Sequence, residues 1–179
     1  MTRAARHAAD GLVLLALACA AYALKRFYSG ASAAELLFIL SPTARVVELA
    51  TATAWRFEAG VGFVSVAHAT AIVPACAGIN FVIAATATLS VGFLGHFGSL
   101  AGKVGWALWA VAIALITAPV VNAIRILADL ALRDVVLANH LHASAHRGLG
   151  VMVYFGATCL LYTLADRLAA FPSMESRCP

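Results

Sequence analysis

The sequence predicts an all-α polytopic membrane protein with about four transmembrane helices, an interfacial helix and a small extracytoplasmic β-hairpin. Of its 179 residues, 63% are hydrophobic and 11% are charged, whereas soluble domains are about 45–50% apolar and about 25% charged. No acidic residue occurs between Glu58 and Asp129, and Lys103 is the only Lys or Arg in that stretch before Arg125. Because a charge at the bilayer centre costs about 2.5–3.5 kcal/mol, this gap indicates a chain that crosses lipid.

The chain is expected to form one membrane domain over residues 1–179, with a core at about 40–166 and polar tails at 1–10 and 169–179. Its net charge of +4 is attributed to arginines near lipid headgroups. The sequence has no basic run interleaved with aromatic residues, so nucleic acid is not an expected partner. The expected partner is the lipid bilayer, and the oligomeric state is left open.

The first apolar run covers residues 11–24 and allows two interpretations. Its basic start and the Ala-Ser-Ala at 31–33 resemble a signal peptide with a cleavage site. Lys25 and Arg26 separate the apolar run from that site. We therefore favour an uncleaved transmembrane helix.

Two segments are expected to lie outside the hydrocarbon. Residues 35–57 mix apolar and charged side chains, which favours a helix lying at the interface over a tilted fifth span. In residues 57–73, β-branched residues follow a glycine pair, and the stretches Phe-Val-Ser-Val and Thr-Ala-Ile-Val predict a short β-hairpin. Unpaired strands cannot sit in lipid.

Three further spans are predicted. Pro74 suits the first turn of a helix, so one span is expected to begin there and to continue over 75–94. A tight loop at 96–103 leads to a second span at 104–121, which Pro119 can kink or end. Residues 122–146 predict an amphipathic helix, and 148–168 the last span.

An even number of spans places both termini on one side of the membrane. The hairpin, Cys76, Arg125 and the His-rich stretch 140–146 would then share the opposite side. The positive-inside rule does not support an outward-facing site, because the segments proposed to lie outside carry more Lys and Arg. Charge alone therefore leaves the orientation open.

Cys76 is the candidate nucleophile. In the first turn of a helix opened by Pro74, free N–H groups and the helix dipole would favour the thiolate. Gly78 is expected to keep this turn uncrowded for a substrate backbone. The competing interpretation is a cysteine packed at a helix start. Cys19 and Cys159 lie inside apolar runs and Cys178 lies in the polar tail, so no role is expected for them.

Arg125 is the candidate cation, since an arginine between Ile124 and Ile126 needs an anionic partner. It could favour the thiolate or stabilise an oxyanion; the alternative is an arginine that snorkels to lipid headgroups. Asn122, three residues earlier on the same helix face, could donate a further hydrogen bond.

His146 is the candidate proton shuttle, with His140 and His142 as competitors that spacing does not exclude. The His-x-His pair could bind a metal, but no third ligand is evident, and we expect no cofactor. A cysteine, a cation and a histidine on one membrane face suit acyl transfer through a thioester.

Three motifs in order resemble the exosortase/archaeosortase family: Pro-Ala-Cys-Ala-Gly-Ile-Asn-Phe at 74–81, Asn-Ala-Ile-Arg-Ile at 122–126 and His-Arg-Gly-Leu-Gly at 146–150. The short chain is most similar to the small exosortase K branch. The resemblance implies a multi-pass protein of the bacterial inner membrane, with its active site facing the periplasm. Many family members are longer, with additional amino-terminal spans.

The resemblance also implies roles. Cys76 would be the nucleophile, Arg125 the arginine and His146 the histidine, with Asn122, Gly78 and Asn80 in support. Such enzymes are thought to cleave a C-terminal sorting signal of membrane-anchored exported proteins and to transfer the product to an acceptor. The alternatives are a cysteine protease that only hydrolyses, and a non-catalytic membrane scaffold or carrier subunit.

Overall fold

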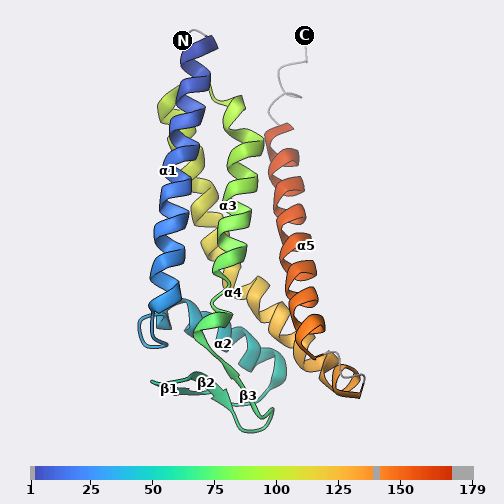
Figure 1. Ribbon diagram of the computed structural model, residues 1–179. Coiled ribbons are helices and arrows are strands. Elements are labelled where there is room, and N and C mark those ends of the chain that lie inside the picture. Colours follow the sequence, from blue (N-terminus) through green and yellow to red (C-terminus); the bar gives the residue numbers. More distant parts are fainter. Residues whose placement is uncertain (1–2, 139–141, 171–179) are drawn as a thin grey trace.

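The computed structural model describes residues 3–138 and 142–170, with side chains for 3–132 and 148–169. Four long helices run side by side, and a small sheet with a short helix lies across one end of them (Figure 1). The helices are α1 (Arg3–Gly30), α2 (Leu37–Thr51), α3 (Ile79–Phe93), α4 (Leu100–Ala138) and α5 (His142–Ala170), with 3₁₀ turns η1 (Pro74–Cys76) and η2 (Leu94–His96).

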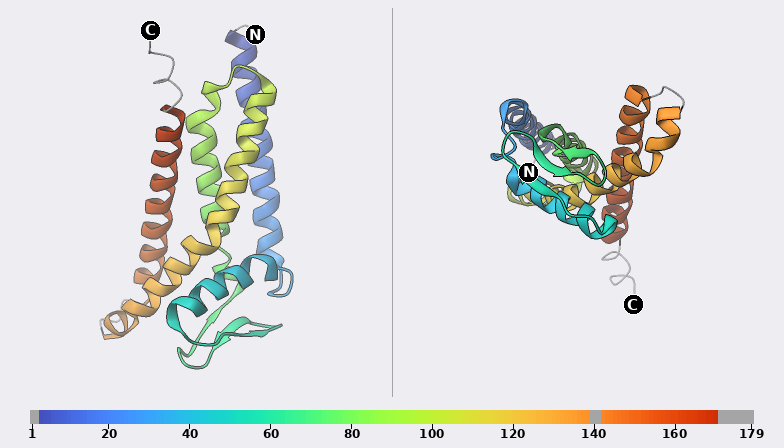
Figure 2. Two further views of the ribbon diagram at one scale, coloured as in Figure 1. Left: turned by 180° about the vertical axis from the view of Figure 1, so that it is seen from behind. Right: turned by 90° about the horizontal axis from the view of Figure 1, so that it is seen from below.

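Four helical segments of the described chain are long and apolar enough to cross a membrane: Arg3–Gly30, Pro74–His96, Leu100–Leu132 and Gly148–Ala169. This is the number that the sequence predicted. The beginning of α1 and the end of α5 lie at the same end of the bundle, opposite the sheet (Figure 1). Helix α2 has 15 residues and lies across the bundle end (Figure 2), in keeping with the prediction of a non-spanning helix.

Helix α4 differs from the prediction. The sequence indicated a span ending near residue 121 and a separate amphipathic helix after it. Instead, one helix continues through Pro119 to Ala138, and it bends along its length (Figure 2). A proline inside a helix removes one backbone hydrogen bond and kinks the helix without necessarily ending it. Asn122 and Arg125 therefore lie on a direct continuation of the third span.

The sheet has three antiparallel strands, β1 (Arg56–Glu58), β2 (Gly62–Ser65) and β3 (Thr70–Ile72), in the order β1-β2-β3. The predicted hairpin corresponds to β2 and β3, in which Phe63 pairs with Ile72. Strand β1 was not predicted, because three residues are too few for an alternation of apolar and polar side chains to be recognised; all three are exposed in the structure. The sheet ends four residues before Cys76.

Gly62→Ala is expected to destabilise the sheet. Gly62 has φ of 129°, and a Cβ there would lie 2.2 Å from the carbonyl oxygen of Ile72. We expect the free energy of unfolding to fall by about 2 kcal/mol, measured by denaturation in detergent micelles. Gly60→Ala is the matched control, since a Cβ at Gly60 meets nothing within 4 Å. Equal stability of the two variants would contradict this geometry.

The largest hydrophobic cluster lies between α2, the sheet, α3 and α4. Leu36, Leu40, Val47, Ile72 and Phe81 are at most 1% exposed, and each such side chain contributes about 1.5–3 kcal/mol on burial. Cys76 packs against the edge of this cluster. The turn that carries the cysteine is therefore held on a closely packed support.

The segment between α1 and α2 also joins this cluster. Ala33 is 3% exposed, so the Ala-Ser-Ala stretch considered as a cleavage site is partly buried here. The hydroxyl and the N–H of Ser32 both donate to the Glu35 carboxylate, at 2.7 and 2.8 Å. These two hydrogen bonds lower the pKa of Glu35 below its ordinary value.

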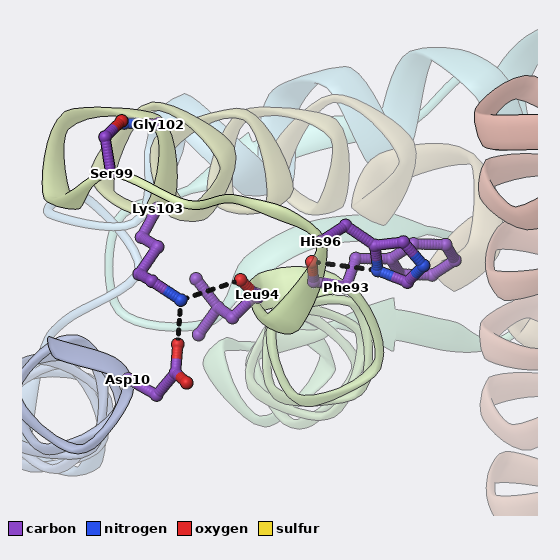
Figure 3. Close-up of polar contacts among 7 residues, drawn as sticks. All are labelled: Asp10, Phe93, Leu94, His96, Ser99, Gly102 and Lys103. Carbon is purple, nitrogen blue, oxygen red and sulfur yellow. Dashed lines mark hydrogen bonds and ion pairs between the residues drawn. The ribbon is translucent and has the colours of Figure 1, made fainter. Parts of the chain in front are cut away.

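An ion pair is found at the opposite end of the bundle (Figure 3). Lys103 is 1% exposed, and its Nζ donates to the Asp10 carboxylate and, at 3.0 Å, to the carbonyl oxygen of Leu94. The sequence predicted Lys103 in a loop, whereas α4 already begins at Leu100. The lysine thereby ties α1 and the start of η2 to α4.

Candidate functional site

Cys76 closes the 3₁₀ turn η1 between β3 and α3. Its N–H donates to the carbonyl oxygen of Val73 at 2.7 Å, and its free thiol is half-buried. The sequence predicted that Pro74 begins the span helix itself. The α-helix begins only at Ile79, so Cys76 lies in the 3₁₀ turn before the helix and not in the first turn of the helix.

Gly78 allows the turn to lie close to α4. It is buried and adopts the left-handed conformation with φ of 70°, which costs other residues about 1–2 kcal/mol. A Cβ at this position would lie 3.4 Å from the Cβ of Asn122. Gly78 therefore faces α4, whereas the sequence analysis expected it to leave room for a substrate.

Asn122 is the centre of the polar contacts at this end of the molecule. The side chain is fully buried, and its Nδ2 donates to the carbonyl oxygen of Cys76. Its Oδ1 accepts from Arg125 Nε at 3.3 Å and from the Tyr154 hydroxyl at 3.0 Å. One amide thus connects the cysteine turn, α4 and α5, which is a larger role than the supporting one that the sequence predicted.

Arg125 is held inside the protein and does not extend to the surface. It is 9% exposed, and its guanidinium carbon lies 6.0 Å from the centroid of the Tyr154 ring, a distance suited to cation–π attraction. A Cβ on Gly150 would lie 3.4 Å from the Arg125 Cδ, so the glycine of the His-Arg-Gly-Leu-Gly motif gives room to this arginine. The snorkelling alternative does not fit this burial.

Tyr154 was not identified from the sequence. It interacts electrostatically with both Arg125 and Cys76, so these three side chains lie near one another. Gly150 and Tyr154 lie four residues apart and share one face of α5, but this spacing does not indicate the contact with Asn122. The side chains of His146 and His142 and the whole of His140 lie outside the described part of the chain.

A groove between α3 and α5 leads away from the site. Its volume is about 620 Å³, and it extends from Asn80 and Tyr154 near Cys76 to Tyr162 and Thr163. On α5 the groove runs from Val151 to Thr163, a rise of about 18 Å. At its mouth, Asn80 Oδ1 accepts a hydrogen bond from Lys25 Nζ at 2.5 Å.

Other candidate ligands and thiols show no comparable environment. Among the side chains that the structure describes, no group of three His, Cys, Asp or Glu could hold a metal ion. Cys19 and Cys159 are free and exposed, as expected of cysteines in apolar runs, and Cys178 lies outside the described residues. Within the described chain, Cys76 alone combines a thiol with a buried polar network.

No family model matches this chain, and the searches of curated proteins and of solved structures return no significant match. Function must therefore be inferred from the residues and the geometry of the site.

Proposed function

We propose that this protein is a membrane-embedded cysteine transpeptidase of the exosortase type, which cleaves a C-terminal sorting signal from membrane-anchored exported proteins. The observation that carries the proposal is the shared amide of Asn122. It donates to the main chain of Cys76 and accepts from Arg125. A nucleophile and a cation are thereby linked in one network at the end of four apolar helices.

In this proposal the four apolar helices cross a bacterial inner membrane, with the sheet, α2 and Cys76 on the periplasmic side. Many large apolar side chains of these helices are exposed, among them Leu15, Ile116, Met152 and Phe155. Exposed apolar surface of this extent marks contact with lipid or with another apolar partner. The buried Arg125 would lie near the boundary between lipid and solvent, in a medium where charges interact strongly.

The reaction would proceed through a thioester. His146 takes the proton of the Cys76 thiol as Sγ attacks the scissile carbonyl, and Arg125 stabilises the negative charge on the carbonyl oxygen of the tetrahedral intermediate. The C–N bond breaks, and His146 gives a proton to the departing amine. His146 then takes a proton from the acceptor nucleophile as that group attacks the thioester and releases Cys76.

The groove between α3 and α5 suits the membrane anchor of the substrate. If the substrate's anchor helix lies along this groove, the chain that emerges from the outer end of the helix lies beside Asn80 and Tyr154, and so beside Cys76. The extended segment before the anchor could add to a free edge of the small sheet, as peptides do in β-augmentation. Strand β3 leads directly into the turn that holds the nucleophile.

The test is to trap the acyl-enzyme. The protein is co-expressed with a candidate substrate that carries a C-terminal anchor. A hydroxylamine-sensitive adduct is expected on the wild type and absent from Cys76→Ser. Cys19→Ser is the matched control that retains the adduct, because Cys19 is a free, exposed thiol on α1 outside the groove lining. Processing that continues unchanged in Cys76→Ser would refute the proposal. A free carboxylate as the sole product would indicate a cysteine protease that hydrolyses.

A further inference from the structure

Among the described residues of the polar network at the site, Tyr154 carries a hydroxyl that the proposed reaction does not use. The Tyr154 hydroxyl donates a hydrogen bond to Asn122 Oδ1 at 3.0 Å, and Tyr154 lies on α5, 32 positions after Asn122 in the sequence. Its ring also packs against Phe81, with the ring centroids 5.8 Å apart, and lies under the Arg125 guanidinium. The ring is therefore held in place by contacts that do not involve the hydroxyl.

The hydroxyl stabilises the orientation of the Asn122 amide that Arg125 and the Cys76 carbonyl oxygen set. The oxygen and nitrogen of an amide are nearly equal in size, so its orientation follows from the donors and acceptors around it. Arg125 Nε can only donate, but its hydrogen bond to Oδ1 is long at 3.3 Å. The shorter hydrogen bond from Tyr154 provides the second donor to Oδ1, which leaves Nδ2 directed to the carbonyl oxygen of Cys76.

The position of Cys76 depends on this orientation. With the amide reversed, its NH₂ group would face the Arg125 Nε–H, donor against donor, while its oxygen faced the Cys76 carbonyl oxygen. The turn would then lose its side-chain hydrogen bond to α4, although its main-chain bonds within η1 would remain. A buried acceptor left without a donor is costly, so the turn would open away from α4.

We propose that Tyr154 is a positioning residue, whose hydroxyl holds the Asn122 amide in place and thereby holds the Cys76 turn against α4. It acts through Asn122 and is itself not a catalytic residue. The proposal concerns the same site and, for its effect on activity, rests on the proposed function. Its effect on the Cys76 thiol does not depend on that function.

The test measures the reactivity of the Cys76 thiol. Cys19, Cys159 and Cys178 are replaced by serine, and the rate of alkylation by N-ethylmaleimide is followed in membranes at several pH values. Tyr154→Phe keeps the ring and removes the hydroxyl. We expect Cys76 to react about 3- to 10-fold faster, the change in an opening equilibrium that follows from losing one buried hydrogen bond. Tyr22→Phe, on the exposed face of α1, should leave the rate unchanged.

A second variant separates positioning from a general loss of packing. Asn122→Leu removes the donor to Cys76 and is expected to raise the alkylation rate by itself. In that background Tyr154→Phe should add no further increase, because the amide through which Tyr154 acts is gone. An equal increase in both backgrounds, or no change in either, would overturn the proposal.

The two proposals fail in different ways. If the protein is not a peptidase, no variant cleaves a substrate. Cys76 nevertheless reacts faster with N-ethylmaleimide in Tyr154→Phe than in the protein that keeps Tyr154. If Tyr154 has no positioning role, wild type and Tyr154→Phe process the substrate with the same kcat and KM and alkylate at the same rate.

Discussion

Replacing Asp10 by asparagine is expected to lower the free energy of unfolding by about 3 kcal/mol. The reason is that Lys103 is 1% exposed and its ammonium group would keep only the carbonyl oxygen of Leu94 among the contacts shown in Figure 3. Breaking one side of a buried ion pair leaves an uncompensated charge in a medium of low dielectric constant. This loss of stability is at the lower end of the range for breaking a buried ion pair, because Asp10 itself is 25% exposed. Denaturation in mixed detergent micelles measures it.

The double variant Asp10→Leu with Lys103→Met provides the control. Replacing both charges of a buried pair by apolar groups of similar size is often neutral or stabilising, so its stability should approach that of the wild type. Glu48→Gln should change the stability by less than about 1 kcal/mol, because its partner Arg45 is 77% exposed. If Asp10→Asn is no less stable than Glu48→Gln, Asp10 is not needed to stabilise the buried charge of Lys103.

Most of the helices could be predicted from the sequence, because an apolar run of about 20 residues is typical of a membrane-spanning helix and of few other structures. The errors occurred where a local signal competes with packing. Pro119 indicated a helix end, but the flanking turns pack against neighbouring helices and α4 continues. Strand β1 has no apolar pattern of its own and forms by pairing with β2, where Phe57 faces Phe63.

The site was predictable only in part. Cys76, Asn122 and Arg125 could be identified because each is unusual next to an apolar run, and the structure links all three. Tyr154 could not, since its partner Asn122 lies 32 positions away and no local pattern marks such a contact. The contact of Gly78 with Asn122 could not be predicted for a similar reason, because Asn122 belongs to another helix.

Replacing Arg125 by alanine is expected to lower kcat/KM for cleavage of the sorting signal by about 10²–10³-fold, the loss found when one group that stabilises an oxyanion is removed. This expectation follows from the proposed function and from the burial of the guanidinium, which is 9% exposed. A buried cation acts on developing charge with little screening by water. The rate of signal cleavage in membranes measures the effect, and trapping of the acyl-enzyme shows whether formation of the thioester is the step that slows.

Arg125→Lys separates charge from geometry. Lysine keeps the positive charge but lacks both the Nε–H that reaches Asn122 and the planar group that faces the Tyr154 ring. If charge alone stabilises the oxyanion, lysine should restore most of the activity; if the network must hold the cation in place, lysine should resemble alanine. We expect the second outcome, since Gly150 and Tyr154 shape this space for a guanidinium. Arg45→Ala, on an exposed arginine of α2, is the matched control, and an equal loss there would show that Arg125 has no special role in the reaction.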